Sequence, residues 1–274
     1  YMQKRILVLI LSIFSCSLAL CQTHKNMISF SVGTSLPIGD FGSSNFSNDN
    51  AGFAKFGEGL NFSFEHKIST SFSLSAMLYG QRNPLNTKAF ESEFSNGLFS
   101  YGGTYGGTTD VNPPPTINIP NWKFKKTKWL SAGFLVGGVN EFSLSPKKNN
   151  LFIDIKAMIG LAYSMSPNLY GSGASDTASG TQTMNCKSAI GFNYLVGGGL
   201  RYNITPTYCL LFDAQYLGTN EFKYKNVTQT FMGEIAPSPT SLTDVSIAWK
   251  SSTIANSTQK IASLNFSIGI GMRF

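Results

Sequence analysis

Residues 263–274 read SLNFSIGIGMRF, and every second position in this stretch is large and apolar. The positions between them, from Ser263 to Arg273, hold only small or polar side chains. In a β-strand successive side chains point to opposite faces, whereas a helix repeats every ~3.6 residues. The stretch therefore predicts a strand with one apolar face and one small, polar face.

The same alternation recurs seven times upstream. The predicted strands cover residues 28–36, 56–65, 71–78, 130–137, 151–163, 190–202 and 208–216, and short turns alternate with long polar segments between them. Transmembrane barrels have short turns at one end and long loops at the other. We therefore predict an all-β fold, a transmembrane antiparallel up-and-down β-barrel with eight strands. Its long extracellular loops would be residues 37–53, 80–128, 165–187 and 218–260.

The fourth run is the least regular of the eight. Its alternation breaks down after Val136, at Gly137-Gly138-Val139, and Glu141 and Phe142 do not restore it. Because a glycine inside a strand often marks a bulge, we predict a bulge at this point.

Composition favours a barrel whose apolar face points outward. Charged residues make up 13% of the chain, about half of the usual globular share. The opposite face is rich in glycine and serine, which suit the narrow interior of an eight-stranded barrel. A soluble exported β-barrel or β-sandwich binding protein remains the alternative.

Six charged residues fall on the predicted lumen face. They are Glu65, Asp154, Lys156, Arg201, Asp213 and Arg273. Three acids and three bases nearly neutralise each other, and buried charges are tolerated only when they are paired. We therefore predict an ion-pair network that plugs the lumen. The alternative is a selectivity ring in a narrow pore or a transport-accessory barrel.

Aromatic residues lie near the ends of several predicted strands. They are Tyr79, Trp129, Tyr163, Tyr202, Tyr208 and Tyr216. Aromatic girdles at both membrane interfaces are typical of outer-membrane barrels, so we predict such a girdle here. The alternative is that these residues are present only because aromatic side chains favour strands.

The N-terminus reads as a secretory signal peptide. Lys4 and Arg5 precede an apolar run that is too short to span a bilayer, and small residues follow it up to Cys21. We predict a signal peptide at residues 1–21, cleaved after Cys21, and a barrel domain at residues 22–274; lipidation of Cys21 is the alternative. Cys186 and Cys209 fall at opposite ends of the predicted barrel, so we predict free thiols.

Charge and chemistry narrow the function. The net charge is +7, but the lysines are scattered, so we predict no nucleic-acid partner and instead outer-membrane lipid and lipopolysaccharide. His24 precedes the first predicted strand and His66 lies at a short turn, so a histidine base cannot reach the outer rim. The sequence therefore predicts no enzymatic activity, and it predicts no cofactor or metal site because no ligand-spaced cluster is present.

The chain resembles the outer-membrane β-barrel families common in Bacteroidetes, which are related in architecture to the OmpA transmembrane domain. The resemblance rests on residues 36–41 (LPIGDF), 51–53 (AGF) and 57–59 (GEG), and on the aromatic C-terminus. It implies an integral outer-membrane protein whose last strand carries the signal for the barrel-assembly machinery, Phe266, Ile268, Ile270, Met272 and Phe274. The implied role is structural or surface interaction, with the loops meeting an unknown extracellular ligand.

Overall fold

The structure, a computed structural model, describes residues 25–96, 99–100, 116–117, 119, 121–145, 150–176, 178–235 and 247–274. The signal peptide predicted at residues 1–21, with Cys21 at its end, lies outside the described residues, as does His24. The first part of the chain forms β1 (Asn26–Pro37), the 3-10 helix η1 (Gly39–Gly42), β2 (Gly57–Lys67), β3 (Phe72–Pro84), α2 (Thr87–Asn96), β4 (Phe99–Ser100), β5 (Thr116–Ile117) and β6 (Lys123–Phe124). The rest forms β7 (Lys128–Ser143), β8 (Leu151–Met165), β9 (Leu169–Ala174), β10 (Ala178–Met184), β11 (Ser188–Asn203), β12 (Tyr208–Ile235) and β13 (Ile247–Arg273).

Eight strands close into a ring. Each pairs antiparallel with the next in the order β1, β2, β3, β7, β8, β11, β12 and β13, and β13 returns to pair with β1. The predicted eight-stranded up-and-down β-barrel is therefore confirmed. Closure leaves the ring without a free edge, so backbone hydrogen bonds are satisfied all the way around.

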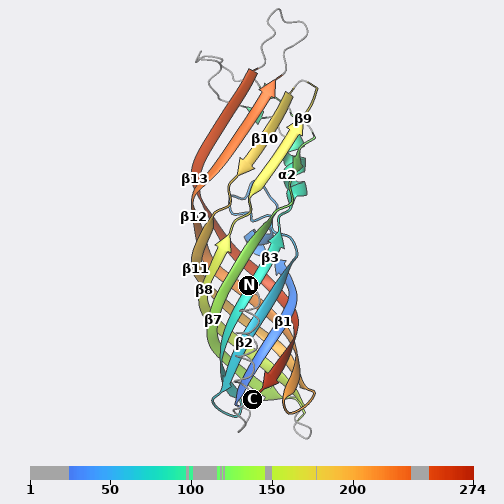
Figure 1. Cartoon of the computed structure of the whole chain (residues 1–274), viewed down its shortest axis with the longest axis vertical. Coiled ribbons are helices and arrows are strands. Elements are labelled where there is room, and N and C mark those ends of the chain that lie inside the picture. The colour runs from blue at the N-terminus through green and yellow to red at the C-terminus, as the bar shows by residue number, and fades with distance from the viewer. Residues whose placement is uncertain are drawn as a thin grey trace, which may run out of the picture.

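The two ends of the barrel differ. One end, here called the turn end, carries the C-terminus and the strand ends that the three short connections join: β2 to β3, β7 to β8 and β11 to β12. At the other end, β9, β10 and α2 lie beyond the ring, as Figure 1 shows.

Every second side chain of the ring points away from the lumen, and most of these are apolar and exposed. They include Phe30, Val32, Leu60, Phe62, Leu78, Phe134, Ile159, Leu161, Ile190, Val196, Phe212, Phe266, Ile268 and Ile270. The small and polar side chains of the same strands are buried in the lumen, among them Ser29, Ser31 and Ser63. The predicted orientation of the two faces is therefore confirmed. Among the described residues no helix is long and apolar enough to cross a bilayer.

The bulge predicted in the fourth barrel strand is wrong. β7 pairs with both β3 and β8 without any register shift through Gly137 and Gly138. The alternation continues there, with Val139 fully buried in the lumen and Asn140 exposed. The two glycines have no side chains, so they hide the pattern rather than break it.

Two of the predicted loops are largely strands. β12 and β13 remain paired well past the ring as far as Ile235 and Ile247, and β10, β9 and β6 add to the edge of β12 in that order. We call this region the extension: α2, β6, β9, β10, residues 219–235 of β12 and residues 247–262 of β13. β9 and β10 consist mostly of small residues, as in Ala178–Met184, so their two faces differ too little for a hydrophobic pattern to detect. β12 does alternate here, with Phe222 and Tyr224 buried between exposed charged residues, and this signal was available in the sequence.

The extension has an aromatic core of its own. Trp122 is 1% exposed, and its ring lies within 6 Å of the rings of Phe94, Phe124 and Phe231. On the sheet beneath, a Cβ on Gly173 would lie only 2.9 Å from the Trp122 ring, so this strand position requires glycine. This core is continuous with the apolar side chains of the lumen.

Candidate functional site

Arg201 lies at the centre of a charged cluster near the turn end of the lumen. Its side chain is 2% exposed, and three carboxylates surround its guanidinium. Nη2 lies 3.0 Å from Oε2 of Glu65 and 2.7 Å from Oδ2 of Asp154, and Nη1 lies 3.0 Å from Oε1 of Glu141. We call these four residues the Arg201 cluster. A guanidinium has five N–H donors in a fixed plane, so one arginine can bind several carboxylates at once.

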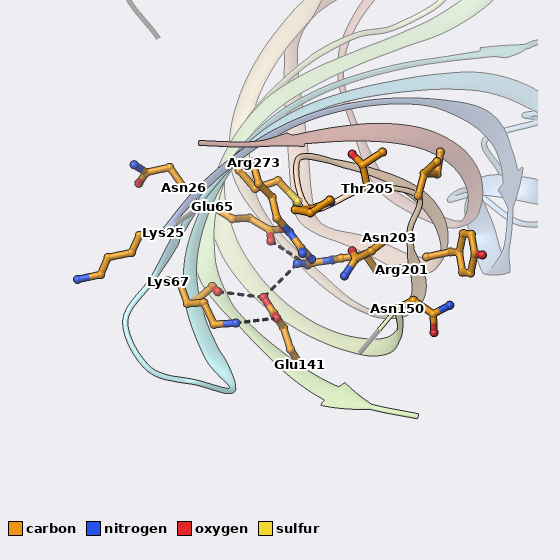
Figure 2. Close-up of a pocket in the computed structure, with 15 residues that line it drawn as sticks. Lys25, Asn26, Glu65, Lys67, Glu141, Asn150, Arg201, Asn203, Thr205 and Arg273 are labelled. Atoms are coloured by element: carbon orange, nitrogen blue, oxygen red, sulfur yellow. Dashed lines mark hydrogen bonds and ion pairs between the residues drawn. The ribbon is translucent and has the colours of Figure 1, made fainter. Parts of the chain in front are cut away.

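Four separate strands supply the Arg201 cluster. Glu65 comes from β2, Glu141 from β7, Asp154 from β8 and Arg201 from β11. Each is at a lumen-facing position close to the turn end of its strand, so closure of the ring brings the four together. Figure 2 shows Glu65 and Glu141 pointing toward the guanidinium.

A second buried pair joins β8 and β12, the two strands that flank β11. Lys156 Nζ is 2.9 Å from Asp213 Oδ1, and both side chains are less than 10% exposed. Buried ions lose hydration worth several kcal/mol each, so such a pair is stable only when its partners remain together.

Five of the six residues predicted for the lumen network therefore take part in ion pairs. The sixth, Arg273, lines the same end of the lumen but is half-buried, with its guanidinium carbon 6.0 Å from the centre of the Phe152 ring.

Sequence reasoning missed two members of the network, Glu141 and its partner Lys67. Glu141 follows the two glycines that hide the alternation of β7, so its face could not be assigned. Its carboxylate also accepts hydrogen bonds from Lys67 Nζ and Ser73 Oγ, each at 3.3 Å. Counting from the buried Val139 by twos would have placed Glu141 in the lumen.

An open pocket leads to the Arg201 cluster from the turn end. Its volume is 660 Å³, and its walls include Lys25, Asn150, Arg201 and Arg273. Farther into the lumen, apolar side chains replace charged ones: Met77, Leu135, Met158, Leu195 and Leu217 are each less than 5% exposed and belong to one core cluster. The lumen thus contains a charged layer followed by a mixed layer, in which these bulky apolar side chains lie among uncharged polar ones such as Ser63, opposite Met77, and Ser263, opposite Leu217.

The predicted aromatic girdle is wrong for two of its residues, which point into the barrel. Tyr79 is 6% exposed in the lumen and accepts a hydrogen bond from Asn193 Nδ2 at 3.0 Å. Trp129 is also buried, and its Nε1 donates to the carbonyl of Gly52 at 2.8 Å. Each is next to an outward-facing residue on its strand, so the alternation places its side chain inward. The prediction of a girdle relied instead on nearness to a strand end, which does not tell which face a side chain is on.

The other four aromatic residues face outward. Tyr163, Tyr202 and Tyr208 are exposed, and Tyr216 is half-buried beside the Tyr194 ring. Whether they form an interfacial girdle stays a prediction. On the last strand, the five residues of the predicted assembly signal share the outward face: Phe266, Ile268, Ile270, Met272 and Phe274.

The remaining reactive side chains are spread apart. Cys186 and Cys209 are both free thiols, as predicted. His66 lies at the turn end, with Nδ1 2.8 Å from Asn26 Oδ1. Within the described part of the chain, no group of three or more His, Cys, Asp or Glu side chains is arranged to hold a metal ion.

No family model matches the chain, and no curated protein matches it in sequence. Several solved structures are similar to it. Neisserial surface protein A has 11% sequence identity and a TM-score of 0.36, covering 91% of this chain and 96% of that one. Ail of Yersinia pestis, solved with the heparin analogue sucrose octasulfate, has 12% identity and a TM-score of 0.39, covering 91% and 99%. A major outer membrane protein from Thermus thermophilus has 12% identity and a TM-score of 0.40, covering 92% and 100%.

Proposed function

We propose that this chain is an integral barrel of the bacterial outer membrane, with a plugged lumen and an extension that meets a ligand outside the cell. The membrane location is supported by the outward face of the ring, where side chains such as Ile190, Leu161 and Ile270 are 72%, 62% and 63% exposed. Exposing so many apolar side chains to water would be costly, whereas lipid accepts them. The turn end then faces the periplasm and the extension faces outward.

The plug is supported by the two layers of the lumen. An ion crossing the charged layer would have to displace Arg201 from three carboxylates. It would then meet the mixed layer, where bulky side chains such as Leu135 and Leu217 are no more than 1% exposed. A barrel of eight strands has an interior that side chains fill, in agreement with this proposal.

The surface role rests on one observation: the extension is a folded sheet with its own core. Trp122, Phe124 and Phe231 are buried there by side chains from several segments, including α2. A preformed surface loses little conformational entropy on binding, so a folded extension suits recognition of a ligand. The proposed role is not catalytic, in keeping with the position of His66 at the turn end.

The proposal also covers biogenesis. A signal peptide would direct export and then be cleaved. The outward face of β13, followed by the aromatic Phe274, would be read by the barrel-assembly machinery. These steps rest on the sequence pattern of residues 1–21 and 263–274.

Two measurements on one pair of proteins test the proposal. The pair is the whole chain and a trimmed variant in which short turns replace residues 86–126, 167–186 and 220–260, which removes α2, β6, β9 and β10 with the ends of β12 and β13. We expect both proteins to fold, which is seen as a shift between unheated and boiled samples on a gel. In planar bilayers, neither protein should give stable openings. Cells that display the whole chain should adhere better to wells coated with extracellular matrix than cells with the trimmed variant. Stable ion-selective openings of the whole chain would favour a pore, and equal adhesion to every coating would contradict the surface role.

A further inference from the structure

A groove crosses the outer surface of the barrel near its extension end. Its volume is 930 Å³. The floor is made by Gly80 of β3 and Ala132 of β7, which lie opposite each other in the register and point outward. Leu60 of β2 and Tyr163 of β8 flank them. The next pair toward the turn end, Leu78 opposite Phe134, is bulky on both strands. We call this feature the outer groove.

The outer groove leaves free space above Gly80. A Cβ added to Gly80 would meet only Leu60, with Cγ 3.8 Å away. Apart from Glu58 and Arg82 at one end, the exposed lining is mostly apolar and is continuous with the outward band of the ring. An occupant of the groove must therefore be an apolar chain drawn from whatever surrounds the barrel, which in the proposed location is lipid.

A cationic site adjoins the outer groove at its end nearer the extension. Glu58 and Arg82 belong to both, and they form an exposed ion pair with Nη2 2.6 Å from Oε2. The adjoining pocket has a volume of 580 Å³ and is also lined by Lys126 and Lys128, both exposed. Three cations therefore face a single carboxylate, which leaves an excess of positive charge at the edge of the apolar band.

We propose that the outer groove and these cations bind a phosphorylated acyl lipid of the lipid A class in the outer leaflet. One acyl chain would lie over Gly80 and Ala132, and a phosphate would lie between Lys126 and Lys128. A phosphate monoester carries about two negative charges at neutral pH, which complements the excess of cations. A zwitterionic phospholipid headgroup would bring its own cation to the site and fits the charge less well. The inference depends on the proposed membrane location, but not on the surface role of the extension.

Fluorescent lipid A titrated into the protein in phosphatidylcholine nanodiscs tests the inference. Lys126→Gln with Lys128→Gln removes the phosphate contacts, and Ala132→Phe fills the groove. The matched controls are Lys223→Gln with Lys225→Gln, which removes the same charge from the extension, and Ala157→Phe, which adds the same bulk to an outward position of β8. We expect each test variant to weaken binding by on the order of tenfold, and each control by less than about twofold.

Three results would overturn the inference. The first is that the test variants bind like their controls. The second is that dephosphorylated lipid A binds as tightly as the phosphorylated form. The third is that inorganic phosphate alone displaces the lipid, since a free anion would then be the ligand. An unheated-versus-boiled gel of the same samples reports the fold, so a failure of the proposed barrel insertion would be seen separately.

Discussion

Arg201 and Asp154 lie on neighbouring strands but are not register partners. Asp154 lies opposite Gly199, and Arg201 lies opposite Phe152. Their side chains meet diagonally on the lumen face of these two strands, where Nη2 and Oδ2 are 2.7 Å apart and Nε and Oδ2 are 3.0 Å apart. Gly199, opposite Asp154, leaves room for the Asp213 carboxylate, with which a Cβ at this position would collide. The energetic weight of this contact can be tested directly.

Removing the charge of Arg201 should strongly destabilise the barrel. Arg201→Met leaves Glu65 and Asp154 buried without their counter-ion and Glu141 paired only with Lys67, and breaking a buried ion pair costs about 3–5 kcal/mol. The measurement is the urea midpoint of unfolding in lipid vesicles, read by the gel shift. The control is Lys260→Ala, whose ion pair with Glu221 is exposed at 3.6 Å and should contribute less than about 1 kcal/mol.

Neutralising the whole Arg201 cluster should recover much of that loss. Arg201→Met combined with Glu65→Gln, Glu141→Gln and Asp154→Asn leaves no buried charge at this point, and uncharged replacements of buried ion networks are often tolerated. An unfolding midpoint no higher than that of Arg201→Met alone would contradict the view that unpaired carboxylates cause the loss.

The Lys156–Asp213 pair should show clear energetic coupling. Lys156→Met and Asp213→Asn each leave one buried charge or polar group without its partner, whereas the double variant removes both. Directly contacting residues have interaction energies of about 0.5–3 kcal/mol. In a double-mutant cycle on unfolding free energy, the double variant should therefore lose less than the two single variants combined. Strict additivity would show that the 2.9 Å contact has no net effect on stability.

Trp122→Ala should loosen the extension and spare the barrel. Truncating a buried tryptophan costs about 3–5 kcal/mol, and its contacts are with Phe94, Phe124 and Phe231 rather than with the charged layer. We expect added protease to cut the extension of the variant quickly on intact cells, while the heat-dependent gel shift stays unchanged. Tyr170→Ala, at an exposed position of β9, is the control and should stay resistant. Loss of the gel shift in Trp122→Ala would mean that the two regions fold as one unit.

Cys186 should react with a maleimide in the folded protein, whereas Cys209 should react only after unfolding. Cys186 is half-buried between β10 and β11, and burial raises the pKa of its thiol. A raised pKa means less thiolate at neutral pH, so labelling of intact cells by an impermeant maleimide should be slow at about pH 7. It should quicken by roughly tenfold per pH unit up to about pH 9.

Cys209, 2% exposed in the lumen with Sγ 3.7 Å from Met27 Sδ, should be labelled only after denaturation. Cys186→Ser should abolish labelling of intact cells. Labelling of Cys186 only after the outer membrane is permeabilised would reverse the proposed orientation.

The sequence alone was sufficient for the barrel. The alternation of residues such as Phe266, Ile268 and Ile270 determined eight strands and which face is apolar, because period two is a local property of an extended chain. The same alternation selected five of the residues that form buried ion pairs. It also correctly placed the short turns and the C-terminus at the same end, since strand number and loop lengths follow from counting.

Only the tertiary structure decided which lumen residues meet and what the long segments form. The partners of Arg201 are residues 65, 141 and 154, and their meeting depends on the register of four strands and on ring closure, which no local pattern encodes. β9 and β10 have little apolar contrast. The extension they belong to is stabilised by Trp122 and the rings around it, which come from segments far apart in the chain.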